Sequence, residues 1–135
     1  MHFLFPVFAL VALTFAVTFS AFIARVRTVA TRRMDISEFK LLDIKKAPPF
    51  VERSTRHMAN LFEMPVLFYV ASLVALNLRL DDALALALAW TYVALRYAHS
   101  FIHLTYNHVP HRMPVFMTSN LVMAALWMRI FVMLP

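Results

Sequence analysis

Four long apolar runs, separated by short polar segments, dominate the amino-acid sequence. The first run, residues 3–24, contains no charged residue and is long enough, at about 1.5 Å per residue, to cross a hydrocarbon core of about 30 Å. A cleaved signal peptide is the alternative, but no basic residue precedes the run and it exceeds a typical signal core. The later runs predict helices over about residues 51–80, 82–107 and 113–134. The pattern predicts an all-α, single-domain integral membrane protein of four transmembrane helices, residues 1–135.

The polar segments between these runs indicate how the helices are joined. Residues 25–50 form a polar connection that ends at the pair Pro48-Pro49, which discourages helix formation just before it. Asp81 and Asp82 mark a very short turn, in which either aspartate can cap the next helix. The first and third connections are therefore expected on the same side of the membrane.

Prolines and one arginine refine the helix boundaries. Pro65 is expected to kink the second helix mildly rather than end it, because neighbouring helices can satisfy the freed carbonyl. Pro110 and Pro114 are expected to break the third helix and restart the fourth. Arg129 is close enough to the end of the fourth helix to snorkel to the membrane surface.

Composition and charge support a membrane location. The chain is 62% hydrophobic and 15% charged, which is too apolar for an ordinary soluble domain. Nine of the thirteen Lys and Arg residues lie between Arg25 and Arg56, next to apolar spans. This clustering indicates membrane topology rather than nucleic-acid binding, and it places the connections at about 25–50 and 107–113 on the cytoplasmic side of an inner or plasma membrane. The chain has no cysteine, so any thiol chemistry must use a thiol from another molecule.

Two helices each have one polar face within their apolar spans. Arg56, Asn60 and Glu63 follow one another at i, i+4 and i+7, and the third helix has Arg96, His99 and His103 at i, i+3 and i+7. Antiparallel packing brings the two faces to the same depth. Because an isolated charge in lipid is costly, the spacing predicts an ion pair between Glu63 and Arg96.

The same polar residues allow more than one function. They can clamp two helices together without chemistry, or they can form a ligand site, since at least five polar groups converge where one or two suffice for a clamp. The spacing of His99 and His103 also fits a metal-binding HxxxH pair, with His108 and His111 nearby. A histidine-based metalloenzyme is therefore a third alternative, and no metal ligand is assigned.

Two stretches resemble a known family. ERSTRHMANLFEMPVLF is similar to the helix-two signature of the MAPEG superfamily, the membrane-associated proteins in eicosanoid and glutathione metabolism. LRYAHSFIHLTYNHVPHR is similar to the helix-three motif of that family and the loop after it. The chain thus resembles a bacterial-type MAPEG member, and the resemblance implies a homotrimer of four-helix bundles with glutathione between neighbouring subunits near the cytoplasmic side.

The resemblance also implies roles for individual residues. Arg112 matches the arginine proposed to hold the glutathione thiolate. The positions expected to bind glutathione are Arg27, Arg56, Asn60, Glu63, Arg96, His99 and His103. Two residues depart from the eicosanoid enzymes: His103 replaces a tyrosine, and Met113 replaces the serine of the prostaglandin synthase type. The implied function is that of a glutathione-dependent transferase or peroxidase acting on a lipophilic substrate, with a non-catalytic scaffold or lipid-binding protein as the alternative.

Overall fold

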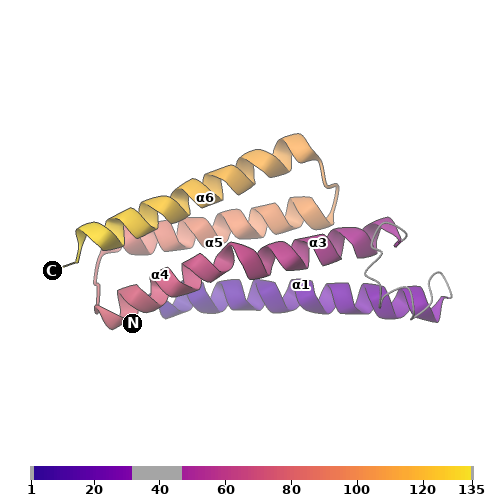
Figure 1. Ribbon diagram of the computed structural model, residues 1–135, viewed down its shortest axis with the longest axis horizontal. Helices are drawn as coiled ribbons and strands as arrows, with labels where there is room; N and C mark the ends of the chain where they lie inside the picture. Colours follow the sequence, from indigo (N-terminus) through magenta and orange to yellow (C-terminus); the bar gives the residue numbers. More distant parts are fainter. Residues whose placement is uncertain (1, 32–46, 135) are drawn as a thin grey trace.

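The chain folds into a bundle of helices that lie roughly along one axis (Figure 1). The computed structural model describes residues 2–31 and 47–134, so most of the connection predicted at 25–50 lies outside the described residues. The helices are α1 (Leu4–Ala30), α3 (Pro49–Glu63), α4 (Pro65–Asn77), α5 (Ala83–Leu104) and α6 (Val109–Val132). In the described ranges all regular structure is helical, which confirms the all-α prediction.

The antiparallel course of the chain places its connections at two ends. The end of α1, the start of α3 and the α5–α6 connection lie at one end, and both termini and the α4–α5 connection lie at the other (Figure 1). Helix α5 packs most extensively against α6 and also contacts α1 and α3. Small residues allow this close packing, since Ala85 and Ala89 of α5 are completely buried.

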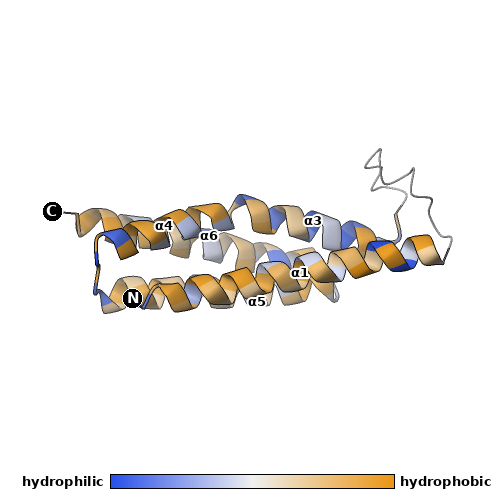
Figure 2. Cartoon of the chain, turned by 90° about the horizontal axis from the view of Figure 1, so that it is seen from below, coloured by the Kyte–Doolittle hydropathy of each residue, from blue (hydrophilic) through white to orange (hydrophobic). Residues whose placement is uncertain are grey.

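Within the described residues, three helical spans are long and apolar enough to cross a membrane: α1, α3 with α4, and α6. Large apolar side chains such as Phe15 and Phe19 of α1 are exposed, as expected for lipid-facing positions. Hydrophilic residues gather on α3 and at the α4–α5 connection (Figure 2). Helix α5, the third predicted span, is not among these three spans, because it contains Arg96, His99 and His103, and all three residues are buried within the bundle.

Proline acts differently at the two predicted sites. At Pro65 the preceding residue, Met64, keeps helical dihedral angles of φ −65° and ψ −37°, so α3 and α4 form one span and the helix does not end at the proline, as predicted. At the other site the predicted start near residue 113 is wrong, because α6 already begins at Val109 and includes Pro114. Pro110 lies in the first turn, where a missing N–H removes no helical hydrogen bond. Arg112 therefore lies on a helix and not in a loop.

The first helix is longer than predicted. It continues past residue 24 to Ala30, because Arg25 and Arg27 are compatible with helix even where the apolar run ends. At this end the guanidinium of Arg25 donates to Thr55 Oγ1 at 3.0 Å, which joins α1 to α3. The position of α3 beside α1 is thus fixed by a polar contact near the end of the bundle where the polar faces lie.

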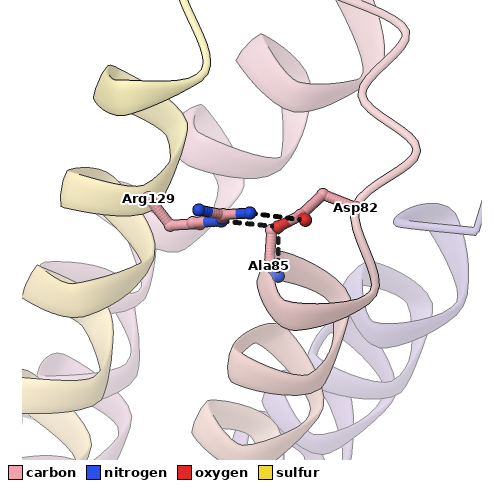
Figure 3. Close-up of polar contacts among 3 residues, drawn as sticks. All are labelled: Asp82, Ala85 and Arg129. Atoms are coloured by element: carbon pink, nitrogen blue, oxygen red, sulfur yellow. Dashed lines mark hydrogen bonds and ion pairs between the residues drawn. The ribbon is translucent and has the colours of Figure 1, made fainter.

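The opposite end of the bundle is fixed by Asp82 and Arg129 (Figure 3). Asp82 caps α5 by accepting from the Ala85 N–H at 2.8 Å, as predicted for one of the two aspartates. Arg129 Nε donates to Asp82 Oδ2 and Arg129 Nη2 donates to Asp82 Oδ1, each at 2.9 Å. Arg129 therefore does not extend to the surface alone, as the sequence suggested, because a carboxylate on the neighbouring helix lies within its reach.

Candidate functional site

A half-open pocket of about 660 Å³ lies where α3 begins and α5 ends. Its walls come from α3, α5, the α5–α6 connection and the first turns of α6. Five predicted site residues line it: Arg56, Asn60, His99, His103 and Arg112. The other lining residues are Pro49, Glu52, Arg53, Asn107, Val109, Met113 and Phe116.

Three arginines give the pocket a positive charge, and each is held by a partner on the chain. Arg53 donates to the backbone carbonyl of Thr105 at 2.7 Å, which joins α3 to the end of α5. Arg56 pairs with Glu52 at 2.7 Å, and Arg112 donates to Asn107 Oδ1 at 2.6 Å. A guanidinium has five N–H donors, so each arginine keeps further donors for a ligand.

Arg96 lies behind the pocket and does not line it. Its side chain is 0% exposed and lies over the rings of Tyr92 and Phe116, at 5.0 and 5.2 Å from their centroids. It donates to the Tyr92 hydroxyl at 3.0 Å, to Asn60 Oδ1 at 3.2 Å and to Asn120 Oδ1 at 2.9 Å. Asn60 is therefore the link between the buried cation and the pocket.

The predicted ion pair between Glu63 and Arg96 is not formed. Glu63 is exposed at the end of α3, whereas the donors of Arg96 are directed at Asn60, Asn120 and Tyr92. Asn60 and Glu63 are three residues apart on a helix with 3.6 residues per turn, so their directions differ by about 60°. This difference is enough to turn Glu63 outward once Asn60 faces Arg96.

Three buried histidine rings form a cluster, of which His99 and His103 line the pocket and His57 lies behind them. His57 of α3 stacks on His103 at 4.8 Å and lies 5.5 Å from His99, centroid to centroid. His57 Nε2 lies 2.8 Å from Ser100 Oγ. The Nδ1 atoms of all three rings are buried and have no hydrogen-bond partner among the described residues. Within residues 2–31 and 47–134, no three His, Asp or Glu side chains are arranged to hold a metal ion, so the predicted metal alternative has no geometric support.

Besides the buried Arg96, two predicted site residues lie outside this pocket. Arg27 is exposed and lines a separate pocket of about 430 Å³ together with residues of α1 and the start of α3. Glu63 is exposed on α3. A single chain therefore does not bring Arg27 and Glu63 to the other five residues.

Sequence reasoning missed several residues of the site and of its supporting network. Arg53 lies three residues before Arg56, and this helical spacing was a usable signal. Glu52 lies four residues before Arg56, so the helical spacing also indicated this ion pair. The contact of Asn107 with Arg112 had no comparable signal in the sequence. The roles of His57 and Asn120 depend on tertiary packing, because their partners Ser100 and Arg96 lie on another helix.

The comparison with protein families covers nearly the whole chain. A model of the MAPEG family matches residues 3–132. The chain belongs to the MAPEG family. No curated protein and no solved structure matches it significantly. With three helical spans apolar enough to cross a bilayer, this MAPEG protein is an integral membrane protein.

The two departures from the eicosanoid enzymes both lie in the pocket of this MAPEG protein. His103 and Met113 line it, one on the inner wall and one on α6. His103 also stacks on His57, so its ring belongs to the buried cluster. The difference from the eicosanoid enzymes therefore falls in the lining of the pocket, and not in a distant packing position.

Proposed function

We propose that the pocket binds glutathione and that the protein uses the glutathione thiolate against a lipophilic electrophile or hydroperoxide. The observation on which this proposal rests is the convergence of Arg53, Arg56, Arg112 and Asn60 on one half-open pocket. The pocket volume of about 660 Å³ falls within the range of about 300–1,000 Å³ that is usual for small-molecule sites. Membership of a family named for eicosanoid and glutathione metabolism supports the choice of thiol.

The charges of glutathione complement those of the pocket. Glutathione has two carboxylates, one ammonium group and one thiol. Arg53 and Arg56 offer the planar donors that suit carboxylates, and Glu52 is the carboxylate among the lining residues that can receive the ammonium group. Arg112 is left to face the sulfur, because its contact with Asn107 occupies a single nitrogen.

Arg112 activates the thiol by electrostatics. A fixed positive charge favours the ionised form of a thiol, and the thiolate is the nucleophile. Attack on an electrophilic carbon forms a C–S bond and releases the leaving group with the bonding electron pair. With a hydroperoxide, attack on oxygen breaks the O–O bond, and a second glutathione completes reduction to alcohol, water and glutathione disulfide. The pocket supplies position and charge for both reactions.

The second substrate reaches the pocket from the bilayer. Val109 and Met113 line the pocket and are exposed, so an apolar edge adjoins the charged interior. We propose that a lipophilic molecule enters laterally past these residues. Polar glutathione enters from the water at the open end.

A homotrimer, as the family resemblance implies, is part of this proposal. Arg27 and Glu63 lie outside the pocket of one chain, and both are exposed. They are therefore available to the pocket of a neighbouring subunit. In this arrangement all eight predicted site residues contribute to glutathione binding directly or through a neighbour.

Turnover by the purified protein tests the proposal. We expect glutathione conjugation to 1-chloro-2,4-dinitrobenzene, or glutathione-dependent reduction of cumene hydroperoxide, and a fall of kcat/KM of about 100-fold in Arg112→Ala, the size seen when a charge-stabilising donor is lost. Arg79→Asn is the matched control, because Arg79 is an exposed arginine at the other end and asparagine tolerates its φ of 51°. Calorimetric titration of glutathione into wild type and Arg56→Ala completes the test. Absence of both turnover and heat in the wild type supports a lipid-binding scaffold instead.

A further inference from the structure

The buried network fixes which end of the Asn60 amide faces the pocket. A guanidinium only donates hydrogen bonds, so the amide atom that meets Arg96 must be an oxygen. Both amides on Arg96 obey this rule, with Asn60 Oδ1 at 3.2 Å and Asn120 Oδ1 at 2.9 Å. The Nδ2 group of Asn60 therefore points away from Arg96. Because Asn60 is half-buried and lines the pocket, this group is the one that remains for a ligand.

We propose that Arg96 is a positioning residue that makes Asn60 a hydrogen-bond donor to an anionic atom of the bound thiol substrate, a carboxylate or the thiolate. This inference rests on the proposed function, and it specifies that Asn60 donates a hydrogen bond to the ligand rather than accepting one. Asn60 is then the contacting residue, and Arg96 acts through it.

The environment of Arg96 explains why it acts indirectly. It is fully buried, and its partners in residues 2–31 and 47–134 are all neutral oxygens. The aromatic rings of Tyr92 and Phe116 cover its faces and shield it from the pocket. No carboxylate in the described chain neutralises this charge. A cation held against Asn60 Oδ1 polarises the amide, which strengthens the donor at the other end.

A purely structural role for Asn60 is the competing explanation. Asn120 has that role in this network, because it accepts from the same guanidinium but does not line the pocket. The two asparagines thus form a matched pair. They share chemistry and partner, and they differ in access to the pocket.

The test compares Asn60→Asp with Asn120→Asp in the full-length protein in detergent. Each substitution places a carboxylate against Arg96 and changes the charge equally. Only Asn60→Asp replaces the pocket-facing N–H donors with an oxygen. We expect Asn60→Asp to weaken binding of glutathione, and of the thiol-free anion glutathione sulfonate, by at least about tenfold, because a charge-assisted hydrogen bond becomes a repulsion. Asn120→Asp is expected to stay within about threefold of the wild type.

Circular dichroism and thermal unfolding check that both variants fold. If Asn60→Asp loses helicity, Asn60→Ala and Asn120→Ala give the same comparison, since only the first removes a pocket donor. Equal affinities in the two members of a pair overturn the inference and leave the proposed function standing. A folded wild type that binds neither probe overturns both.

Discussion

The orientation of one buried histidine follows from two hydrogen bonds. Ser100 Oγ lies 2.8 Å from the Arg96 carbonyl oxygen, which can only accept, so the serine proton is directed there. Ser100 must then accept from His57 Nε2 at 2.8 Å. In the neutral ring, His57 Nδ1 is therefore an acceptor, and it is buried beside His103 with no partner in the part of the chain that the structure describes. The serine thus sets the tautomer of a ring that supports the pocket wall.

Removal of this serine hydroxyl is predicted to destabilise the protein. Ser100→Ala leaves a buried ring N–H of His57 without an acceptor, which costs about 1–3 kcal/mol. Ser72→Ala is the control, because Ser72 Oγ is equally buried and has no partner within the described residues. We expect that control to be neutral or slightly stabilising. Denaturant unfolding in detergent measures the free energy of unfolding of both variants. An equal loss of stability in Ser100→Ala and Ser72→Ala would contradict the assigned tautomer.

Residue spacing correctly predicted which side chains lie together where one helix face determined the outcome. Arg56 and Asn60 share a face and line the same pocket as His99, His103 and Arg112. Spacing failed for Glu63, because a partner for Arg96 was chosen by charge alone. The structure satisfies this cation with neutral oxygens, including one from Asn120 on a helix that the sequence did not connect to it.

Among the helices, α5 is held at both ends by polar contacts. At its start Asp82 accepts from the Ala85 N–H and from Arg129 of α6, and at its end Thr105 accepts from Arg53 of α3. The cap was predictable from an aspartate at the turn, whereas the contacts between helices depend on packing. Helix ends were predicted less well than helix positions, because α1 continues into its polar segment and α6 tolerates Pro114.

The contact between α5 and α6 is predicted to respond to acid. The hydrogen bond from Arg129, with that from the Ala85 N–H, lowers the pKa of Asp82 from 3.8 to about 2. A lowered folded-state pKa gives stability that is fully present above the unfolded pKa of about 3.9 and is lost as the pH falls through about 2. We expect thermal stability to fall between pH 4 and 2, and Asp82→Asn to reduce this dependence.

Asp81→Asn is the control for this pH effect. Asp81 is the exposed neighbour of Asp82 in the same turn, so its replacement changes the charge but keeps the contact with Arg129. Unfolding midpoints at several pH values are measured for the wild type and both variants. If the unfolding midpoint changes with pH to the same extent in all three proteins, the Asp82 contact does not contribute to the pH dependence of stability.

The whole molecule combines a lipid-facing exterior with a polar site at one end. Apolar run lengths were enough to predict a four-helix membrane bundle, since lipid leaves few alternatives for spans of this length. The family model over residues 3–132 agrees with that architecture. The pocket itself could not be read from run lengths, because it depends on the depth at which α3, α5 and α6 meet.

The orientation of the bundle in the membrane is a separate prediction. The excess of Lys and Arg between Arg25 and Arg56 places that end, with the α5–α6 connection and the pocket opening, in the cytoplasm. Because the chain has no cysteine, single-cysteine variants can be labelled without background. In sealed right-side-out vesicles, a membrane-impermeant maleimide should label Asp81→Cys and not His108→Cys, and inside-out vesicles should give the opposite pattern.

Each alternative outcome identifies a different error. A reversed pattern would contradict only the positive-inside assignment, and glutathione would then have to reach the pocket from the outer side. Labelling of both positions from the same side would contradict α5 as a membrane span, since Asp81 and His108 lie at its two ends. That result would matter most for the site, because α5 contains Arg96, His99 and His103 and, within the described residues, is not among the spans apolar enough to cross a membrane. Its burial against α1, α3 and α6 is the physical reason to expect that it crosses the bilayer.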